Sequence, residues 1–420
     1  MIFNFSLFSF SAQSTRRCRR LVSLAALLSA ASVNSHAQSP SIPVFQQEEF
    51  EQCKAALKQQ AQQHGVTSEQ VLQSLSQVQH DHKVIEYDRR QPEFSESFGS
   101  YFNKRVNSWR VDKGRKMLAE HKKLLAKLHK SYGIPPQYLI AFWGLETNFG
   151  SYKGKMSVIR SLVTLACDQR RQAFFTGELI TALKLAQREQ LAPEQMLGSW
   201  AGAMGHTQFM PSAYMQYAVD GDGDGKVNLW ESVDDALTSA ANFLHHLGWK
   251  PGFRWGREVV LDEKFAYQHS GVGKPKTMNA WRELGVVKTD GSAVDKLDIK
   301  ASLIVPAGYK GPAFLVYDNF SVIMRWNYSE FYALAVGHLA DRLAGGGQLH
   351  RPPVKTANLT LAQLMSLQLK LTELGFDVGK ADGILGPATK KGIRAFQSSR
   401  KMIADGFPHQ DLLTTLDIEL

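Results

Sequence analysis

The stretch PPQYLIAFWGLETNFG, residues 135–150, is the most informative part of this chain. The proline pair favours the start of a helix and the final glycine favours its end, so the sequence predicts an apolar helix between them. Glu146 follows Phe142 and Trp143 by one helical turn and shares a face with their rings. Burial there would raise the pKa of Glu146, and a carboxyl group protonated near neutral pH is a general acid. The alternative is a buried Glu paired with an Arg or Lys.

The chain has 420 residues, enough for two or three domains with a substantial core. Its start has an arginine cluster at residues 16–20, a short apolar stretch at 21–33 and a small-x-Ala site at 35–37. This order predicts a cleaved secretory signal over residues 1–37, because the apolar stretch is too short to span a bilayer comfortably. No cysteine stands directly after the apolar stretch, so we expect a periplasmic protein without a lipoprotein anchor. The Sec and twin-arginine export routes both stay open.

The chain is basic, with a formal net charge of +10, of which the signal arginines supply four. A basic exported protein indicates an anionic partner such as a cell-wall polymer or a membrane surface. The sequence contains neither a basic helix nor a module of stacked aromatics, so nucleic acid is not an expected partner. We expect a monomer. Once the signal is removed, Cys53 and Cys167 remain, either as one disulfide or as two separate buried thiols.

The pattern predicts a mainly α chain of α+β class with a small sheet inserted late. Helical periodicity covers most of residues 45–126 and returns at 171–190, 232–247 and 330–343. Between residues 256 and 327 the runs become β-rich, including 301–305. Runs 313–317 and 320–324 are separated by Asp318-Asn319, which favours a β-hairpin. We expect one domain over residues 38–344 and a Gly- and Pro-rich linker over 345–356.

Residues 220–231, DGDGDGKVNLWE, match the EF-hand calcium loop at every diagnostic position. A single loop favours a structural Ca²⁺ over a regulatory sensor, and the alternative is an Asp- and Gly-rich surface turn. The predicted ligands, at loop positions 1, 3, 5, 7, 9 and 12, are Asp220, Asp222, Asp224, the Lys226 carbonyl, Asn228 and Glu231.

Residues 199–212, SWAGAMGHTQFMPS, form a Gly- and Ala-rich segment typical of a ligand-contacting turn or of tight helix packing. Together with residues 142–150, the calcium loop and residues 317–327, this segment makes residues 45–343 resemble the lytic murein transglycosylase B family. The resemblance implies a lysozyme-like catalytic core, flanking helical and small β regions, and a calcium-loaded EF-hand. It also implies that Glu146 is the single catalytic acid.

The resemblance further implies cleavage, without water, of the β-1,4 bond between N-acetylmuramic acid and N-acetylglucosamine. Glu146 would protonate the glycosidic oxygen and then accept a proton from the muramic acid O6 hydroxyl, giving a 1,6-anhydromuramic sugar. Most retaining glycosidases use a second carboxylate. The family lacks one, and the acetamido group of the sugar is expected to assist. Asp168 is a further acid that could act in catalysis. A salt bridge with Arg170 or Arg171 is the preferred interpretation.

The family pattern also predicts residues of the glycan groove. Trp326 stands where the family commonly has Tyr, so stacking on a sugar survives but a hydroxyl contact does not. His206 is a second departure, since many relatives have a different residue there. It is expected to be either a groove contact or a solvated side chain. The predicted groove residues are Ser199, Gln208, Trp326, Asn327 and Tyr332, with Phe243 and Tyr101 as weaker candidates for which core packing is the alternative.

The last residues, 357–420, resemble a small three-helix peptidoglycan-binding domain. Its signature elements are LGF at 374–376, DGILGPAT at 382–389 and AFQ at 395–397, with helices at 361–374 and 390–397. Such a module would hold the enzyme on its polymer, and the alternative is a helical dimerisation unit. The leading hypothesis is an exported lytic transglycosylase acting on peptidoglycan strands, with cell-wall synthesis or remodelling proteins as further partners. The competing hypotheses are a hydrolytic muramidase and a catalytically silent peptidoglycan-binding scaffold.

Overall fold

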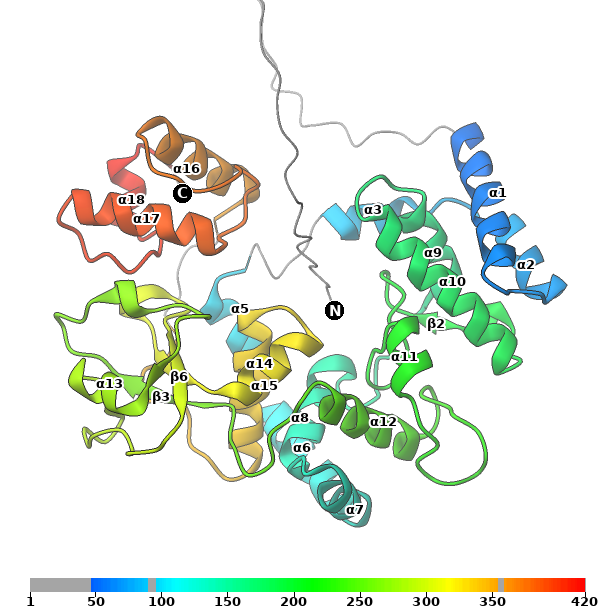
Figure 1. Ribbon diagram of the computed structural model, residues 1–420, viewed down its shortest axis with the longest axis horizontal. Coiled ribbons are helices and arrows are strands. Elements are labelled where there is room, and N and C mark those ends of the chain that lie inside the picture. Colours follow the sequence, from blue (N-terminus) through cyan, green and yellow to red (C-terminus); the bar gives the residue numbers. More distant parts are fainter. Residues whose placement is uncertain (1–46, 90–95, 354–358, 420) are drawn as a thin grey trace, which may run out of the picture.

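The structure, a computed structural model, describes residues 47–89, 96–353 and 359–419, and the predicted signal sequence lies outside them. Most of the described chain is helical, as expected (Figure 1). The helices that precede the sheet are α1 (Gln47–Gln63), α2 (Glu69–Ser76), α3 (His82–Arg89), α5 (Phe98–Arg105), α6 (Ser108–Glu120), α7 (Lys122–Tyr132), α8 (Pro136–Thr147), α9 (Val158–Ala166), α10 (Gln172–Arg188), α11 (Pro211–Tyr217) and α12 (Val233–His246).

The helix predicted from residues 135–150 is α8, and it forms the centre of the core. A helix that is apolar on all sides is stable only when other elements surround it. α8 packs against α6, α7 and α12, and against α15 (Glu330–Leu343) from much later in the chain. Leu139, Ile140, Ala141 and Phe142 are consequently inaccessible to solvent. The last turn of α8 is less enclosed, and Leu145 and Glu146 in it are half-buried.

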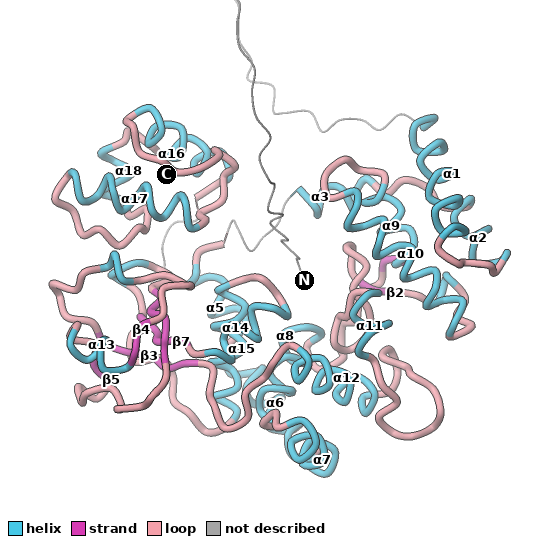
Figure 2. The backbone as a smooth tube through the Cα atoms, in the orientation of Figure 1, coloured by secondary structure: helices cyan, strands magenta, loops and turns pink. Residues whose placement is uncertain are grey.

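The strands of the main sheet gather in one region beside the helical core (Figure 2). The main sheet is antiparallel, with the order β4-β6-β7-β3-β5. Its own small core is centred on Trp281, which is fully buried. The strands and the helix packed among them are β3 (Gly256–Val260), β4 (Lys276–Thr277), α13 (Met278–Glu283), β5 (Val287–Lys288), β6 (Lys300–Ile304) and β7 (Ala313–Val316). A separate two-stranded ribbon joins β1 (Met156–Ser157) to β2 (Leu197–Gly198).

The predicted hairpin over residues 313–324 is wrong. β7 is its first strand, but the second segment is a helix, α14 (Asp318–Trp326). The apolar residues of that segment recur at helical spacing, and Phe320 and Ile323 are buried against the core. Asn319 does not form a turn between strands. Its side-chain amide donates to the carbonyl oxygens of Lys250 and Phe253, at 2.9 and 2.8 Å, which fixes the first turn of α14 to a distant loop.

The amino-terminal helices are covalently tied to the core. Cys53 on α1 and Cys167 at the end of α9 form a disulfide across 114 residues of sequence. The two cysteines are therefore joined as one disulfide and are not separate buried thiols. Such a link stabilises mainly by restricting the unfolded chain, and the effect grows with the length of the closed loop.

The carboxyl-terminal unit contains three helices, α16 (Leu361–Glu373), α17 (Pro387–Ser399) and α18 (Gln410–Thr415), around a core of its own. It lies beside the sheet and the start of α15 (Figure 1). Arg394 Nη2 donates to Ser270 Oγ over 3.2 Å, and the backbone N–H of Tyr309 donates to Asp405 over 2.8 Å. In the described part of the chain, no helix has the length and apolar character needed to cross a membrane.

Candidate active site

Glu146 lies in the last turn of α8, where the helix leaves the core. Pro136 occupies the start of the helix, and the left-handed backbone conformations of Asn148, Phe149 and Gly150 prevent it from continuing. The side chain of Glu146 is half-buried. The sequence therefore predicted the helix correctly, although the turn that ends it begins before the glycine.

Two hydrogen-bond donors meet at one oxygen of Glu146. Trp326 Nε1, at the end of α14, donates to Glu146 Oε1 over 2.8 Å. The hydroxyl of Tyr332, in the first turn of α15, donates to the same oxygen over 2.5 Å. Burial raises the pKa of Tyr332 well above its usual value, and the charge of Glu146 raises it further. The phenol therefore stays protonated and remains a donor.

Trp326 is a supporting residue rather than a surface for sugar stacking. The indole is fully buried, so the prediction that it stacks on a sugar is wrong for this structure. Its ring centroid lies 4.6 Å from that of Phe142, 5.4 Å from that of Phe209 and 5.2 Å from that of Phe243. This aromatic packing fixes the indole N–H toward the carboxylate. A sequence pattern alone does not distinguish an exposed indole from one buried against a helix 180 residues away.

The neighbouring Trp143 faces a different part of the site. Its indole N–H donates to His206 Nδ1 over 3.1 Å, which places the proton of the neutral imidazole on Nε2. Burial, and secondarily the charge of Lys153, lowers the pKa of His206 to about 4. His206 is only 7% exposed, so it is not a solvated side chain. A Cβ on Gly150 would lie 2.3 Å from the imidazole Cε1, so close packing requires glycine there.

Arg110 on α6 holds the end of α8, a function that the sequence analysis missed. Its Nε donates to the carbonyl oxygen of Gly144 over 3.1 Å, and Nη2 donates to the side chain of Asn148 over 2.5 Å. The first bond satisfies a carbonyl in the last turn of the helix, where carbonyls lack partners within the helix. Burial, and then the charge of Arg105, lowers the pKa of Arg110. No spacing rule joins α6 to α8, so only the tertiary structure identifies this contact.

The segment at residues 199–212 forms a tight loop beside α8, and its two predicted groove residues shape that loop. Ser199 Oγ accepts two backbone N–H groups of its own turn, at 3.0 and 3.3 Å. Gln208 has a left-handed backbone with φ of 50°, and its amide donates to the carbonyl oxygens of Lys153 and Gly205 at 3.0 and 2.9 Å. Contact between these side chains and a glycan stays a prediction.

The remaining predicted groove residues are Asn327, Phe243 and Tyr101. Asn327 ends α14 and is 5% exposed. Phe243 is half-buried and stacks on Tyr217, with 4.7 Å between ring centroids. Tyr101 is buried, with the guanidinium of Arg105 lying 3.7 Å from its ring centroid. For Tyr101 the core-packing alternative therefore agrees with the structure.

Asp168 takes part in an ion pair, as preferred, but its partner differs from the predicted one. Its Oδ2 accepts from the guanidinium of Arg89 over 2.7 Å, and its Oδ1 accepts the backbone N–H of Arg170 over 2.9 Å. The guanidinium groups of Arg170 and Arg171 instead bind Asp88, which is fully buried. These contacts assign Asp168 to a structural network.

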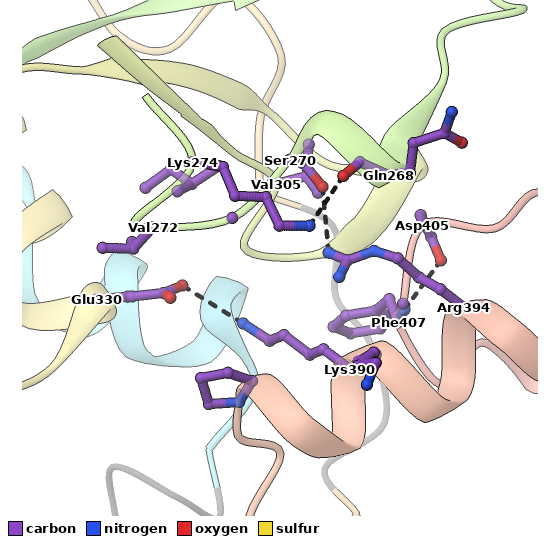
Figure 3. Close-up of a pocket in the computed structure, with 15 residues that line it drawn as sticks. Gln268, Ser270, Val272, Lys274, Val305, Glu330, Lys390, Arg394, Asp405 and Phe407 are labelled. Carbon is purple, nitrogen blue, oxygen red and sulfur yellow. Dashed lines mark hydrogen bonds and ion pairs between the residues drawn. The ribbon is translucent and has the colours of Figure 1, made fainter. Parts of the chain in front are cut away.

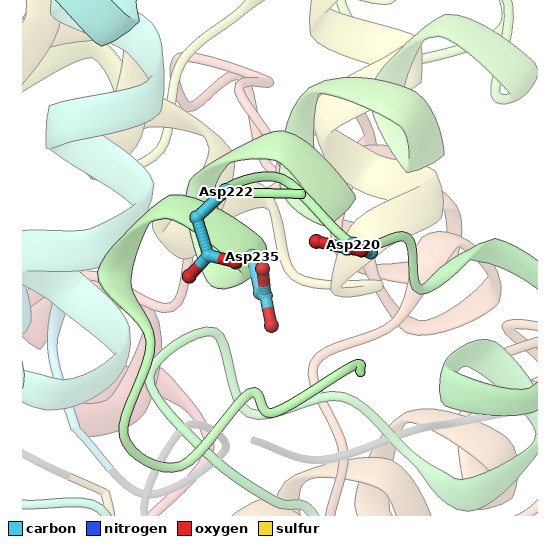
Figure 4. A group of neighbouring side chains, drawn as sticks. All are labelled: Asp220, Asp222 and Asp235. Atoms are coloured by element: carbon cyan, nitrogen blue, oxygen red, sulfur yellow. The ribbon is translucent and has the colours of Figure 1, made fainter. Parts of the chain in front are cut away.

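The calcium-loop segment has the internal hydrogen bonds of a metal-binding turn. Asp220 accepts backbone N–H groups from Gly223 and Gly225, at 2.6 and 2.8 Å, and these bonds lower its pKa, with Gly225 contributing most. Oxygen atoms of Asp220, Asp222 and Asp235 lie within 4.8 Å of one another (Figure 4). Several carboxylate oxygens at this separation fit a hard cation such as Ca²⁺.

Two details of this segment differ from the predicted ligand set. Glu231, the twelfth position, has a 77% exposed side chain paired with Lys153 Nζ at 3.3 Å. Asp235 lies beyond the twelve-residue pattern and was not predicted. It is buried and accepts the backbone N–H groups of Gly221 and Asn228, at 2.8 and 2.7 Å, so it closes the loop. In the sequence, the one signal that could have indicated this role of Asp235 was its place in the first turn of the helix that follows the loop.

The site consists of a carboxylic acid at the end of a core helix, held in place by an indole and a phenol. In a mostly helical fold, this arrangement defines a class of enzyme that cleaves glycosidic bonds by acid catalysis. Comparisons with known proteins specify this class. Residues 49–341 match the transglycosylase SLT domain, and residues 360–416 match a peptidoglycan binding domain. Membrane-bound lytic murein transglycosylase B of Escherichia coli (strain K12) is 32% identical over 291 residues, which cover 67% of this chain and 79% of that protein.

Solved structures agree with this result. SltB3 of Pseudomonas aeruginosa in complex with NAG-anhNAM-pentapeptide is 42% identical, with a TM-score of 0.83 over 88% of this chain and 99% of that chain. The Escherichia coli lytic transglycosylase Slt35 in complex with calcium is 29% identical, with a TM-score of 0.61 over 70% of this chain and 92% of that chain. The chain belongs to the transglycosylase SLT domain family and is, by class, a peptidoglycan lytic transglycosylase with a lysozyme-like fold.

Proposed function

We propose that Glu146 is the single acid and base with which this enzyme cleaves the β-1,4 bond between N-acetylmuramic acid and N-acetylglucosamine. The observation that carries this assignment is the pair of donors, Trp326 and Tyr332, on one carboxylate oxygen of a half-buried acid. The relative SltB3 is known in complex with a sugar that contains 1,6-anhydromuramic acid, the product expected when no water enters the reaction.

The reaction balances with Glu146 and the substrate alone. The acid form of Glu146 gives its proton to the glycosidic oxygen as the bond from that oxygen to C1 of the muramic acid breaks. The O6 hydroxyl of the same sugar then forms a bond to C1, and its proton returns to Glu146. The carboxyl group therefore ends the cycle as it began, and the products together have the composition of the substrate.

The two donors fit both halves of this cycle. Hydrogen bonds from neutral N–H and O–H groups orient the carboxyl group in its acid form and stabilise it in its charged form. Because both end on Oε1, they fix the rotation of the carboxyl group. Fixed orientation of a reacting group lowers the entropy cost of reaching the transition state.

The remaining parts of the proposal concern location and attachment. We place the enzyme in the periplasm after removal of residues 1–37, with Ser199, Gln208 and Asn327 on the glycan groove. We propose that the loop at residues 220–231 binds a structural Ca²⁺ through Asp220, Asp222, Asp224, the Lys226 carbonyl, Asn228 and Glu231. Support comes from the convergent carboxylates of the loop and from the calcium found with Slt35. Glu231 would have to leave Lys153 to reach the ion.

Mass spectrometry of digested peptidoglycan tests the reaction. The transglycosylase product is lighter than the muramidase product by one water, so a reducing-end product would establish hydrolysis instead. A Glu146→Gln variant tests the acid, and the exposed Glu194→Gln is its control. We expect the first change to abolish release of anhydro-muropeptides and the second to leave it unchanged. Equal release by both variants would refute the assignment of Glu146 and would favour another acid.

A further inference from the structure

A cavity of about 380 Å³ lies between the carboxyl-terminal module and the catalytic domain. Its walls come from the segment before β4, the end of β6, the start of α15, one face of α17 and the loop that follows α17 (Figure 3). The size is within the usual range for pockets that hold small ligands. The charged side chains on its walls are Lys274, Glu330, Lys390, Lys391, Arg394 and Asp405, so cations outnumber carboxylates.

The two carboxylates, Glu330 and Asp405, already have partners and are too few to neutralise all of these cations. Asp405 is buried, and its oxygens already accept from His409, the amide of Gln397 and the backbone N–H groups of Tyr309 and Phe407. Glu330 pairs with Lys390 at 3.4 Å. The cationic excess therefore remains with Lys274 on the wall from the catalytic domain and Arg394 on the wall from the module, because Lys391 pairs with Asp377 outside the cavity at 3.9 Å.

Lys274 and Arg394 reach toward each other from the two domains (Figure 3). Lys274 Nζ donates to the carbonyl oxygen of Gln268 over 2.9 Å, and Arg394 Nη2 donates to Ser270 Oγ over 3.2 Å. Both acceptors are neutral. Arg394 Nε is buried, and within the described residues it has no hydrogen-bond acceptor. A buried donor without an acceptor is costly, as are two like charges held close together, and one anion between them would relieve both costs.

We propose that this cavity binds a carboxylate group of a peptide stem of peptidoglycan, between Lys274 of the catalytic domain and Arg394 of the carboxyl-terminal module. A guanidinium group matches the geometry of a carboxylate, and the lysine supplies a second charged donor. The choice of a stem peptide rests on the proposed function, because peptidoglycan strands carry these peptides beside the sugars. Occupancy would bridge the two domains at the base of α15, two residues from Tyr332.

The test measures binding of a stem peptide, so it does not depend on glycan cleavage. The mature chain, residues 38–420, is titrated calorimetrically with the free tetrapeptide L-Ala-γ-D-Glu-diaminopimelyl-D-Ala, with the same peptide amidated at its carboxylates, and with inorganic phosphate. We expect the acidic tetrapeptide to bind, and Lys274→Gln and Arg394→Gln each to weaken it by at least about tenfold, the loss expected for one charged hydrogen bond. Lys380→Gln, an exposed lysine of the same module outside the cavity, should leave the affinity unchanged.

Amidation should weaken binding to the parent as much as either cavity substitution does. Equal affinity of the parent and both cavity variants would overturn the site. Phosphate binding as tightly as the tetrapeptide would overturn the assignment to a peptide carboxylate. Because Lys274 is exposed, its substitution keeps the test valid even where Arg394→Gln loosens the module. A catalytic failure of Glu146→Gln would not affect this result, so the two proposals fail separately.

Discussion

At the scale of single residues, the site is organised around one carboxylate that must both give and accept a proton. For a group that must both give and accept a proton, a fixed position matters more than a large shift of its pKa. Trp326 and Tyr332 provide that position through one oxygen atom, and each is itself immobilised by burial. The catalytic residue is therefore supported by two side chains that belong to later helices, α14 and α15.

Removing either donor should slow the reaction without unfolding the protein. Tyr332→Phe and Trp326→Phe each delete one hydrogen bond to a charged group, worth about 1.5–3 kcal/mol, so kcat should fall by about 10- to 150-fold. Release of anhydro-muropeptides from purified peptidoglycan measures kcat, and circular dichroism checks the fold. The exposed Tyr328→Phe is the matched control, with no expected change. Unchanged kcat in Tyr332→Phe would show that the phenol does not support the acid.

His206 should make stability depend on pH. Burial lowers its pKa to about 4, whereas the ordinary value is 6.5. Between pH 6.5 and 4 the unfolded chain binds a proton at this residue that the folded chain does not bind, so stability falls as the pH falls through this window. The shift corresponds to about 3 kcal/mol when the whole window is crossed. His338, with its pKa also lowered to about 4, first by burial and then by Arg342, should act in the same direction.

Melting temperatures measured between pH 7 and 4 test this expectation. His206→Gln keeps an acceptor for the indole of Trp143 and should flatten the curve. His129→Gln removes an exposed histidine and should leave it unaltered. An identical slope in His206→Gln and the parent would contradict the assigned protonation state.

At the scale of elements, sequence patterns succeeded where a segment carries its own signals. The helix at Glu330–Leu343 was predicted with its observed bounds, because its apolar periodicity follows the cap residue Ser329. The run at residues 320–324 was mistaken for a strand, because it follows the turn-like dipeptide Asp318-Asn319. Burial against α12 and α15 decides its conformation. The same distinction applies to the site. Glu146 was recognised because its own segment carries a motif, whereas the contacts of Arg110 and Trp326 with the end of α8 arise only in the tertiary structure.

The loop at residues 220–231 makes a prediction at this scale. Calcium that binds only the folded protein stabilises it by mass action, by about 2.7 kcal/mol at a concentration 100 times the dissociation constant. Addition of a chelator should lower the melting temperature of the parent. Asp220→Asn, Asp222→Asn and Asp235→Asn should each lower it in the presence of calcium and weaken the response to the chelator. The exposed Asp290→Asn, outside the loop, is the control. A melting curve of the parent that chelator leaves unchanged would refute the metal site.

At the scale of the whole molecule, the enzyme joins a catalytic domain to a module that contacts it through a defined seam. Lys390 with Glu330, Arg394 with Ser270, and Asp405 with Tyr309 connect the two. The module is therefore placed against the start of α15, the helix that supplies Tyr332 to the acid. A module positioned in this way can deliver the polymer to the site as well as increase its local concentration.

Deleting residues 345–420 should reduce activity selectively on the polymer. On insoluble peptidoglycan at low enzyme concentration we expect a loss of at least about tenfold, because tethering a second binding unit commonly raises avidity by about 10²–10⁴-fold. On a soluble glycan fragment that only the catalytic groove can hold, the rate should change by less than about twofold, since this substrate gains nothing from tethering. Turnover of both substrates and the melting temperature are measured for the parent, the truncated chain and Lys380→Gln as control. An equal loss on both substrates, together with a lower melting temperature, would mean that the module supports the catalytic fold through the seam and does not act by tethering.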